Sequence, residues 1–337
     1  MLGIKFDKPW EVAAVELPMP RPKEGEALIK VKAAGICGSD IGAFRGTNPL
    51  VSYPRVIGHE VAGEVVSIPE NDRGIKAGDH VIADPYLYCA ACYPCSIGRT
   101  NCCESLRVLG VHCEGGMAEF FAHPANMLVK VPDDMPWELV PLAEPLTIAL
   151  HGIHRAGLKP GERIAISGAG PIGLLAAMAA LEYGAVPVLI DPVKERLEFS
   201  KKLGVPHVVH LGADDLAEKL REYTDGRGAE VVMEASGAAS AIVAALDIVS
   251  NAGRVILTGW PKNETALDTA KITRKELDIR GARTSAGEFE EAVGLIHSGR
   301  VDVKAILTKT VSLEEAPNAI VDIEKNPGNY LKVNVML

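Results

Sequence analysis

The segment that most constrains the fold lies near the middle of the chain, where residues 163–173 read RIAISGAGPIG. The apolar run RIAIS is typical of a buried strand, and the apolar residues that follow, up to Gly184, are typical of a helix. A second apolar strand, VPVLID at 186–191, precedes an amphipathic helix that ends at Gly204. Strands that alternate with helices in this way predict a parallel sheet covered on both faces.

The glycines of this segment have the spacing GxGxxG, at Gly168, Gly170 and Gly173. Gly168 would permit a tight turn, Gly170 would let a pyrophosphate approach the backbone, and Gly173 would let the helix pack closely on the sheet. The helix opens at Pro171 and Ile172, and its first N–H groups and its dipole favour phosphates. The glycine spacing alone is weak evidence, but its position between a strand and a helix predicts a dinucleotide site.

An acidic residue, Asp191, ends the next strand, 18 residues after Gly173. Its carboxylate could accept hydrogen bonds from ribose hydroxyls and would repel a 2′-phosphate, so the sequence predicts NAD rather than NADP. Arg196 lies about one helical turn further on and could edge the adenine pocket, although a solvated helix face explains it equally well. The plain alternative to the whole site is a glycine-rich turn followed by a surface aspartate.

Five of the seven cysteines lie within a short segment near residue 100. Two successive C-x-x-C steps and a fourth thiol eight residues later suit a closed tetrahedral zinc site, which we expect to be structural because it leaves no open position. Reduced surface thiols are the alternative, but four clustered exposed cysteines would invite oxidation. Cys102 is left as an odd neighbour. The four cysteines of the predicted site are Cys89, Cys92, Cys95 and Cys103.

Length, net charge and the distribution of apolar residues limit the class of protein to which the chain can belong. With 337 residues the chain has room for about two domains. Up to about residue 130, short Val- and Ile-rich runs between glycine and proline turns predict a compact, largely β domain. The net charge of −9 argues against nucleic acid as a partner. No apolar run approaches a membrane span or a signal peptide, so we expect a soluble cytoplasmic protein with no membrane partner.

A second group of potential metal ligands is spread along the chain: Cys37 in GICGSD, His59 and Glu60 in VIGHEVAG, and Glu144 in PLAEPL. A thiolate, an imidazole and carboxylates can bind zinc and leave room for water or substrate, which is the catalytic arrangement. Spacing alone makes this only a suggestion. A lone cysteine is more often a small core residue, and a single His-Glu pair is more often structural.

Six motifs occur in the order and spacing of one known family: GICGSD, PRVIGHEVAGEVV, the four-cysteine segment, GGMAEF, EPL and SGAGPIG. In these motifs the chain resembles the zinc-containing medium-chain alcohol and polyol dehydrogenases nearly end to end. The resemblance implies an α/β protein with a GroES-like, mostly β catalytic domain and a Rossmann domain. It also implies two zinc ions per chain, NAD, and a homodimer or homotetramer.

The resemblance also implies where the domains begin and end. We expect the catalytic domain over residues 1–145, with the structural zinc lobe at about 88–104. The Rossmann domain is expected over 146–283, and a C-terminal segment, 284–337, is expected to complete the catalytic domain.

Carried over by motif, Cys37, His59 and Glu60 are the catalytic zinc ligands or the immediate partners of the zinc. Glu144 looks like the alternate carboxylate ligand that sorbitol- and threonine-dehydrogenase-like members have in EPL. Ser39 matches the hydroxyl that takes the substrate proton. The resemblance leaves open which of the two glutamates is the direct ligand.

One position departs from the family pattern. Many members have a histidine five residues after the catalytic cysteine, where it relays the proton to solvent, but this chain has Gly42 there. We therefore expect the proton to pass from Ser39 through the cofactor ribose or water.

The motifs SYPRVIGHE, GRTNCC and GVHCEGGMAEF look most like those of bacterial dehydrogenases of sugar acids and hexitols, such as the L-galactonate, L-gulonate and L-idonate 5-dehydrogenases. We expect oxidation of a hexonate at C5, or of a polyol. His112 could reach the substrate, although a loop histidine explains it as well, and Arg283 matches a pocket arginine of polyol dehydrogenases. The alternatives are a threonine- or 2,3-butanediol-type dehydrogenase and, outside enzymes, a non-catalytic NAD-binding protein stapled by zinc.

Overall fold

The computed structural model describes all 337 residues. The chain forms two compact units, and each is described by itself. The first unit consists of Met1–Glu144, Phe289–His297 and Val303–Leu337. The second consists of Pro145–Glu288 and Ser298–Asp302.

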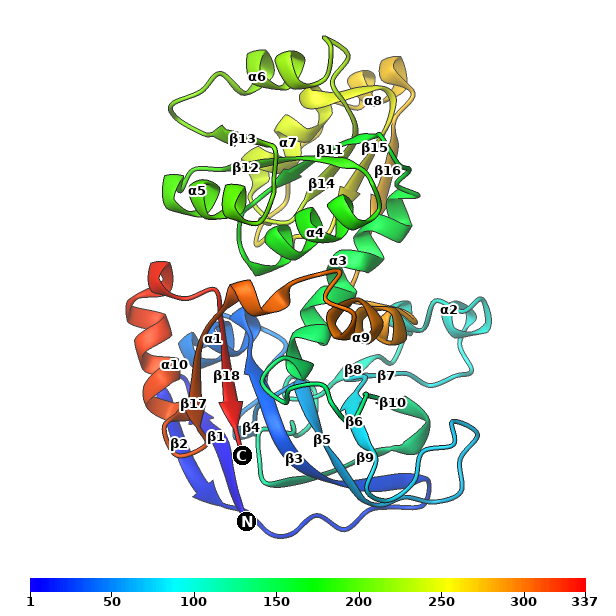
Figure 1. Cartoon of the computed structure of the whole chain (residues 1–337), viewed down its shortest axis with the longest axis vertical. Helices are drawn as coiled ribbons and strands as arrows, with labels where there is room; N and C mark the ends of the chain where they lie inside the picture. The colour runs from blue at the N-terminus through cyan, green and yellow to red at the C-terminus, as the bar shows by residue number, and fades with distance from the viewer. The chain divides into compact units, whose positions relative to one another are not determined.

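The first unit is built around a seven-stranded sheet to which distant parts of the chain contribute (Figure 1). Its central strand, β3 (Glu26–Ile36), is antiparallel to β5 (Glu60–Ser67) on one side and to β18 (Lys332–Met336) on the other. The C-terminal strand therefore lies directly beside a strand formed by the first forty residues. The other strands of this sheet are β6 (His80–Ala83), β9 (Phe120–Pro124), β10 (Leu128–Lys130) and β17 (Leu307–Ser312).

Two small sheets and several helices complete the first unit. One sheet holds β1 (Leu2–Lys8), β2 (Glu11–Glu16) and β4 (Arg55–Val56), and the other holds β7 (Tyr86–Leu87) and β8 (Arg107–Val108). The helices of this unit are α1 (Gly38–Arg45), α2 (Tyr93–Ser96), α9 (Phe289–His297) and α10 (Ala316–Lys325).

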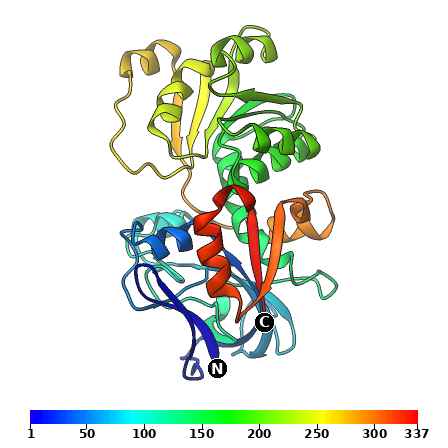
Figure 2. The same ribbon diagram turned by 90° about the vertical axis from the view of Figure 1, so that its left-hand side faces the viewer.

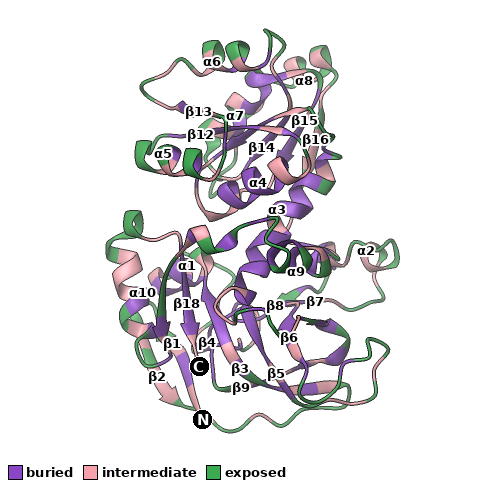
Figure 3. Cartoon of the chain, in the orientation of Figure 1, coloured by how far each residue is buried: buried purple, intermediate pink, exposed green.

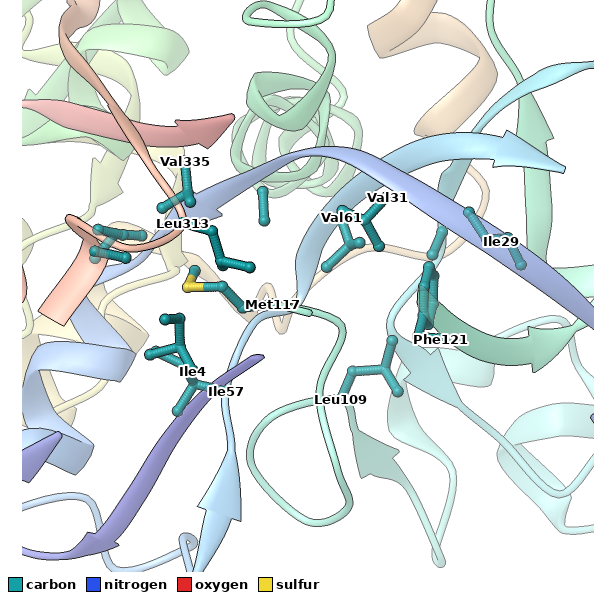
Figure 4. Close-up of a cluster of buried hydrophobic side chains, with 14 of the residues drawn as sticks. Ile4, Ile29, Val31, Ile57, Val61, Leu109, Met117, Phe121, Leu313 and Val335 are labelled. Atoms are coloured by element: carbon teal, nitrogen blue, oxygen red, sulfur yellow. The ribbon is translucent and has the colours of Figure 1, made fainter. Parts of the chain in front are cut away.

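The core of the first unit follows from the alternation of β3. Ile29 and Val31 are buried and point into one apolar cluster, whereas Lys30 between them is exposed, as expected for a strand with one face on the core (Figure 4). Beyond them the last four residues, Ala33–Ile36, are all buried. Burial on both faces explains why small residues occupy this end of the strand, which leads directly to Cys37.

The second unit is a parallel sheet of six strands in the order β13-β12-β11-β14-β15-β16, with helices between successive strands (Figure 2). The strands are β11 (Arg163–Ser167), β12 (Val186–Asp191), β13 (His207–His210), β14 (Ala229–Glu234), β15 (Val249–Leu257) and β16 (Asp278–Gly281). The helices are α4 (Pro171–Glu182), α5 (Lys194–Lys202), α6 (Leu216–Tyr223), α7 (Ala239–Ile248) and α8 (Thr269–Lys275); α3 (Ala143–Ala156) precedes the sheet.

This architecture confirms the predicted α/β fold with one β-rich unit and one parallel-sheet unit. The strands that carry the glycine motif are buried, and residues 173–180 of α4 are buried throughout, as the purple colour in Figure 3 shows. No helix combines the length and the apolar character that a membrane span requires.

Candidate functional site

The first candidate site lies where β3 ends and β5 begins. Cys37 directly follows β3, and His59 directly precedes β5, whose first residue is Glu60. The two strands are antiparallel and Gly35 pairs with Glu60, so these chain segments meet at the same edge. The ligand atoms of the three side chains, Cys37, His59 and Glu60, all lie within 4.8 Å of one another. The structure thus brings together three residues that the sequence analysis singled out from separate motifs.

Two neighbours fix the carboxylate of Glu60. A Cβ atom at Gly35 would lie 1.8 Å from Glu60 Oε2, so only glycine leaves room for this side chain. On the other side of β3, the ammonium group of Lys332 in β18 donates to both carboxylate oxygens of Glu60 and to the Ile36 carbonyl, at 3.1 Å. Lys332 and Glu60 are 3% and 0% exposed. Sequence reasoning missed Lys332; its one signal is a lysine at the start of the terminal strand KVNVM.

The imidazole of His59 is buried between α1 and the sheet. Its Nε2 lies 3.4 Å from the Ser39 hydroxyl. Its Nδ1 is buried without a hydrogen-bond partner, and the nearest carboxylate oxygen, from Asp40, is 3.8 Å away. Asp40 also caps α1, because its Oδ2 accepts the Cys37 N–H at 2.9 Å. Cys37 and Ser39 are half-buried, so the site has an accessible side.

Three buried acidic side chains lie in this region, Asp40, Glu60 and Glu144, beside His59 and Lys332. Burial lowers the pKa of His59, but the charges of Asp40 and Cys37 outweigh it and raise this pKa well above its usual value. Burial raises the pKa of Asp40. The buried acidic groups favour a positive charge on the neighbouring histidine. A bound cation would be stabilised by the same groups.

Glu144 lies in the first turn of α3 and is 1% exposed, but it is not part of the three-residue ligand set. The hydroxyl of Tyr86 in β7 donates to its Oε1. Burial raises the pKa of Glu144 to about 7, and burial together with the Glu144 charge raises the pKa of Tyr86 well above its usual value. Tyr86 is a second residue that sequence reasoning missed, because the segment DPYLYC has no feature that indicates a hydrogen-bond partner 58 residues away.

The donor set of the first site fits zinc. One thiolate, one imidazole and one carboxylate are a ligand set that zinc accepts, with a further position left for substrate or water. The orphaned Nδ1 of His59 and the excess of buried carboxylates are features that a bound cation would satisfy. The individual roles of Cys37, His59, Glu60 and Glu144 toward the metal stay predictions.

The four-cysteine segment forms a second compact ligand set. The sulfur atoms of Cys89, Cys92, Cys95 and Cys103 all lie within 4.8 Å of one another, and Cys102 is not among them. Backbone N–H groups of Ala91 and Cys92 point at Cys89 Sγ, at 3.5 and 3.4 Å, and lower the pKa of this thiol to about 6. Four clustered thiols, one of them stabilised as a thiolate by N–H donors, are a ligand set that a structural zinc site uses, so these residues also fit zinc.

The glycine loop of the second unit connects β11 to α4. Gly168 has φ +103°, a conformation that favours glycine, and its N–H donates to the Ile190 carbonyl at 2.8 Å. A Cβ atom at Gly173 would lie 1.8 Å from the Gly168 carbonyl oxygen. A Cβ atom at Gly170 would meet nothing within 4 Å, so this glycine leaves space that the protein itself does not use. The loop has the open backbone that a pyrophosphate requires.

Asp191 ends β12 beside this loop and is 4% exposed. Its Oδ2 accepts the Ala169 N–H and its Oδ1 accepts the Val193 N–H, both at 2.7 Å. The carboxylate therefore orders the glycine loop. It is also the group that we expect to bind the ribose of the dinucleotide. Arg196 is half-buried on α5. Its predicted place at the adenine pocket stays a prediction.

Two further acidic residues of the second unit were missed. Glu234 at the end of β14 is fully buried and accepts the N–H groups of Ser236 and Gly237, at 2.8 and 3.0 Å. Glu288 accepts from the rings of His151 and His154, at 2.8 and 3.3 Å, and these bonds hold its pKa at about 2 despite burial. Of these two residues, only Glu234 had a signal in the sequence, because it is an acidic residue at the end of an apolar strand.

The two residues expected at the substrate are His112 and Arg283. His112 accepts the Val108 N–H at its Nδ1, at 3.1 Å, so one ring nitrogen holds the local loop. Arg283 is half-buried in the second unit, next to Thr284 with φ +47°. Glu144 belongs to the first unit, so the predicted action of Arg283 on this carboxylate stays a prediction.

Comparisons with known proteins agree with this geometry. A model of the alcohol dehydrogenase GroES-like domain matches residues 23–133, and a model of the zinc-binding dehydrogenases matches residues 171–298. A zinc-type alcohol dehydrogenase-like protein of Haemophilus influenzae, whose activity is uncharacterized, is 54% identical over 99% of this chain and 98% of its own length. The L-galactonate-5-dehydrogenase of Escherichia coli K12 is 37% identical over 89% of this chain and 88% of its own length.

A solved structure extends this likeness to the complete chain. The RspB alcohol dehydrogenase of Escherichia coli CFT073, in complex with NADH, superimposes with a TM-score of 0.94 and 32% identity, over 100% of this chain and 99% of its own. Both units of the present chain therefore have counterparts in a protein that holds a nicotinamide dinucleotide.

The cysteine set makes a prediction about metal content. We expect the purified chain to carry two zinc ions and Cys103→Ser to carry one, because three thiols no longer close the four-cysteine site. Cys102→Ser is the matched control and keeps two, since Cys102 lies outside the set. Elemental analysis of the folded proteins measures this, and two zinc ions in Cys103→Ser would contradict the assignment.

The two glycines of the loop predict different defects. Gly173→Ala brings a methyl group against backbone and should lower the melting temperature of the nucleotide-free protein by about 4 °C or more. Gly170→Ala meets only open space, so it should leave the melting temperature nearly unchanged and weaken NADH binding at least about tenfold. Thermal unfolding and NADH titration separate the two effects. Undiminished NADH affinity in Gly170→Ala would argue against a pyrophosphate at this loop.

Proposed function

The chain belongs to the zinc-binding dehydrogenase family, and within it we propose that this protein is an NAD-dependent dehydrogenase of a sugar acid. The proposed reaction oxidises a secondary alcohol, either at C5 of a hexonate or in a polyol, to a ketone. NAD⁺ accepts the hydride and one proton is released. The observation that carries the proposal is the grouping of Cys37, His59 and Glu60 within 4.8 Å, in a chain that also has the glycine loop and Asp191.

We assign the roles of the two units accordingly. The first unit is the catalytic domain, with boundaries expected at 1–145 and 284–337, and the second is the Rossmann domain, expected over 146–283. Zinc and a nicotinamide dinucleotide are the cofactors of this family, in agreement with the family model and with the NADH-bound relative. We expect the chain to work as a homodimer or homotetramer.

Cys37, His59 and Glu60 would hold the catalytic zinc, with Glu144 as a nearby further carboxylate. Bound there, zinc would supply Lewis acidity that lowers the pKa of a substrate hydroxyl. The chain itself contributes buried acidic side chains and a fixed carboxylate at Glu60. Because Cys37 and Ser39 are half-buried, a substrate can approach from their side.

The proton of the substrate hydroxyl needs an acceptor, and the Ser39 hydroxyl lies at the site, 3.4 Å from His59 Nε2. We propose that Ser39 takes this proton and passes it through water or the cofactor ribose. Position 42 offers no relay, since Gly42 has no side chain. A Cβ atom there would have Asn48 Cβ as its nearest neighbour, at 3.7 Å, so the backbone at this position would accept a first side-chain atom.

Asp191 supports NAD as the dinucleotide. Its carboxylate is ordered by two backbone N–H groups, so its negative charge is held in place beside the glycine loop. A fixed carboxylate at this position accepts ribose hydroxyls and repels a 2′-phosphate. The neighbouring Arg196 would then edge the adenine.

The sugar-acid assignment rests on motifs and relatives together. The relatives include the L-galactonate-5-dehydrogenase of Escherichia coli, and the solved L-idonate 5-dehydrogenase of Escherichia coli shares the fold at 25% identity. Arg283 could bind a substrate carboxylate in a bidentate manner, and His112 could reach a hydroxyl. A threonine dehydrogenase of Bacillus licheniformis, 35% identical, keeps the threonine-type reaction as the second candidate.

A substrate panel tests the proposal. We expect NADH formation to be fastest with L-galactonate, L-gulonate or L-idonate, and slower with hexitols, L-threonine and 2,3-butanediol. NADP should be at least about tenfold poorer as acceptor, because of Asp191. Absorbance of the reduced nicotinamide measures the rates.

Matched variants locate the activity. Cys37→Ser should reduce kcat/KM by about a thousandfold or more while the four-cysteine site keeps its zinc, because a first-site ligand is lost. Cys102→Ser should retain full activity. A preference for threonine or butanediol would favour the second candidate, and a zinc-loaded protein without activity on any alcohol would favour a non-catalytic NAD-binding protein.

A further inference from the structure

We propose that Glu234 is a positioning residue for the nicotinamide half of the dinucleotide, because its carboxylate fixes the loop that follows β14 against the glycine loop. The inference rests on the dinucleotide site of the proposed function and is independent of the substrate and of the metal. It assigns to a buried carboxylate a role in binding that is exerted through a loop.

The strand order places Glu234 at the edge of the sheet where a dinucleotide binds. The chain runs outward from β11 to β13 on one side and from β14 to β16 on the other, so the crevice at the carboxyl ends of β11 and β14 separates two halves. Asp191, at the end of β12, belongs to the half that we expect to bind adenosine. Glu234 is the last residue of β14, so the loop after it borders the half that is left for the nicotinamide mononucleotide.

The side chain of Glu234 is fully buried and holds the first residues of this loop. Its Oε1 accepts the N–H groups of Ser236 and Gly237, at 2.8 and 3.0 Å, and also the Ser236 hydroxyl. Its Oε2 accepts the Gly237 N–H as well, at 3.1 Å. The Ser236 hydroxyl in turn accepts the Ala238 N–H at 3.1 Å. One carboxylate therefore orders three successive residues of the loop, the last of them through Ser236.

The loop that Glu234 fixes lies directly against the glycine loop. A Cβ atom at Gly168 would lie 3.1 Å from Ser236 Cβ. The Ala235 N–H donates to the Ser167 carbonyl at 2.9 Å. Because Gly168 makes the tight turn beside the expected pyrophosphate, a displacement of Ser236 would change the crevice on the side of β14.

The same residue also joins the loop that follows β15. Thr258 and Gly259 donate their N–H groups to the Glu234 carbonyl, at 2.9 and 2.8 Å. A Cβ atom at Gly259 would lie 2.5 Å from Glu234 Oε2 and 2.2 Å from the Gly237 nitrogen, so the two loops pack without spare room. Glu234 thus holds together the loops after β14 and β15, both at the edge of the second half of the sheet.

The test compares the whole dinucleotide with its adenosine half. Glu234→Gln keeps the size of the side chain but places an NH₂ group where a carboxylate oxygen accepts N–H donors, so the loop loses part of its support. This variant should bind NADH about tenfold more weakly, the effect of about one buried hydrogen bond. It should bind AMP within about twofold of the unmodified chain, because AMP occupies only the half that contains Asp191. Fluorescence of NADH measures the first affinity, and displacement of NADH by AMP measures the second.

Two further variants sharpen the comparison. Glu230→Gln alters another glutamate of β14, which accepts the Arg163 N–H at 2.8 Å near the opposite end of the strand, and should leave both affinities unchanged. Ser236→Ala removes only the hydroxyl that bonds to Glu234 and Ala238. It should weaken NADH binding about threefold without affecting AMP, and it decides the question if Glu234→Gln does not fold.

Unchanged NADH affinity in the deciding variant would overturn the inference, and so would an equal loss of NADH and AMP affinity. An equal loss, together with a lower melting temperature of the nucleotide-free protein, is the result expected of a merely structural role. If the unmodified chain bound no NADH, the proposed function would fail together with this inference. Equal NADH binding by the unmodified chain and by Glu234→Gln would contradict this inference alone.

Discussion

A buried ion pair between Glu60 and Lys332 joins two strands that lie 272 residues apart in the chain. Both partners are nearly inaccessible, and a lone buried charge of either sign would be strongly unfavourable. The C-terminal strand must therefore pair with β3 for the Glu60 carboxylate to be tolerated where β5 begins. Cys37 follows β3 and His59 precedes β5, so the geometry of the first candidate metal site depends on this pairing.

The β7–β8 strand pair connects the two candidate metal sites within the first unit. The four-cysteine segment runs between these strands, and Tyr86, in the first of them, contacts Glu144 beside the other site. The strand that leads into the four-cysteine segment in this way places one side chain against a distant carboxylate. Gly35 has a similar role, because the space that it leaves is filled by Glu60.

Local patterns predicted much of this molecule, because their physical causes are local. The strand–glycine–helix alternation and the C-x-x-C steps depend on neighbours in sequence, and the structure has α4 and α5 ending shortly before Gly184 and Gly204, both with positive φ. Lys332 and Tyr86 could not be predicted, since their roles exist only after distant segments pair. The family resemblance first indicated which motif residues form one ligand set. The structure then showed that Cys37, His59 and Glu60 lie together.

The central claim is that the first unit holds a second zinc ion among Cys37, His59 and Glu60, separate from the four-cysteine site. Anomalous diffraction at the zinc absorption edge, on crystals of the unmodified chain, tests it most directly. The account predicts two anomalous peaks per chain, one within each ligand set. A single peak at the four cysteines, in a protein supplied with zinc, would contradict it.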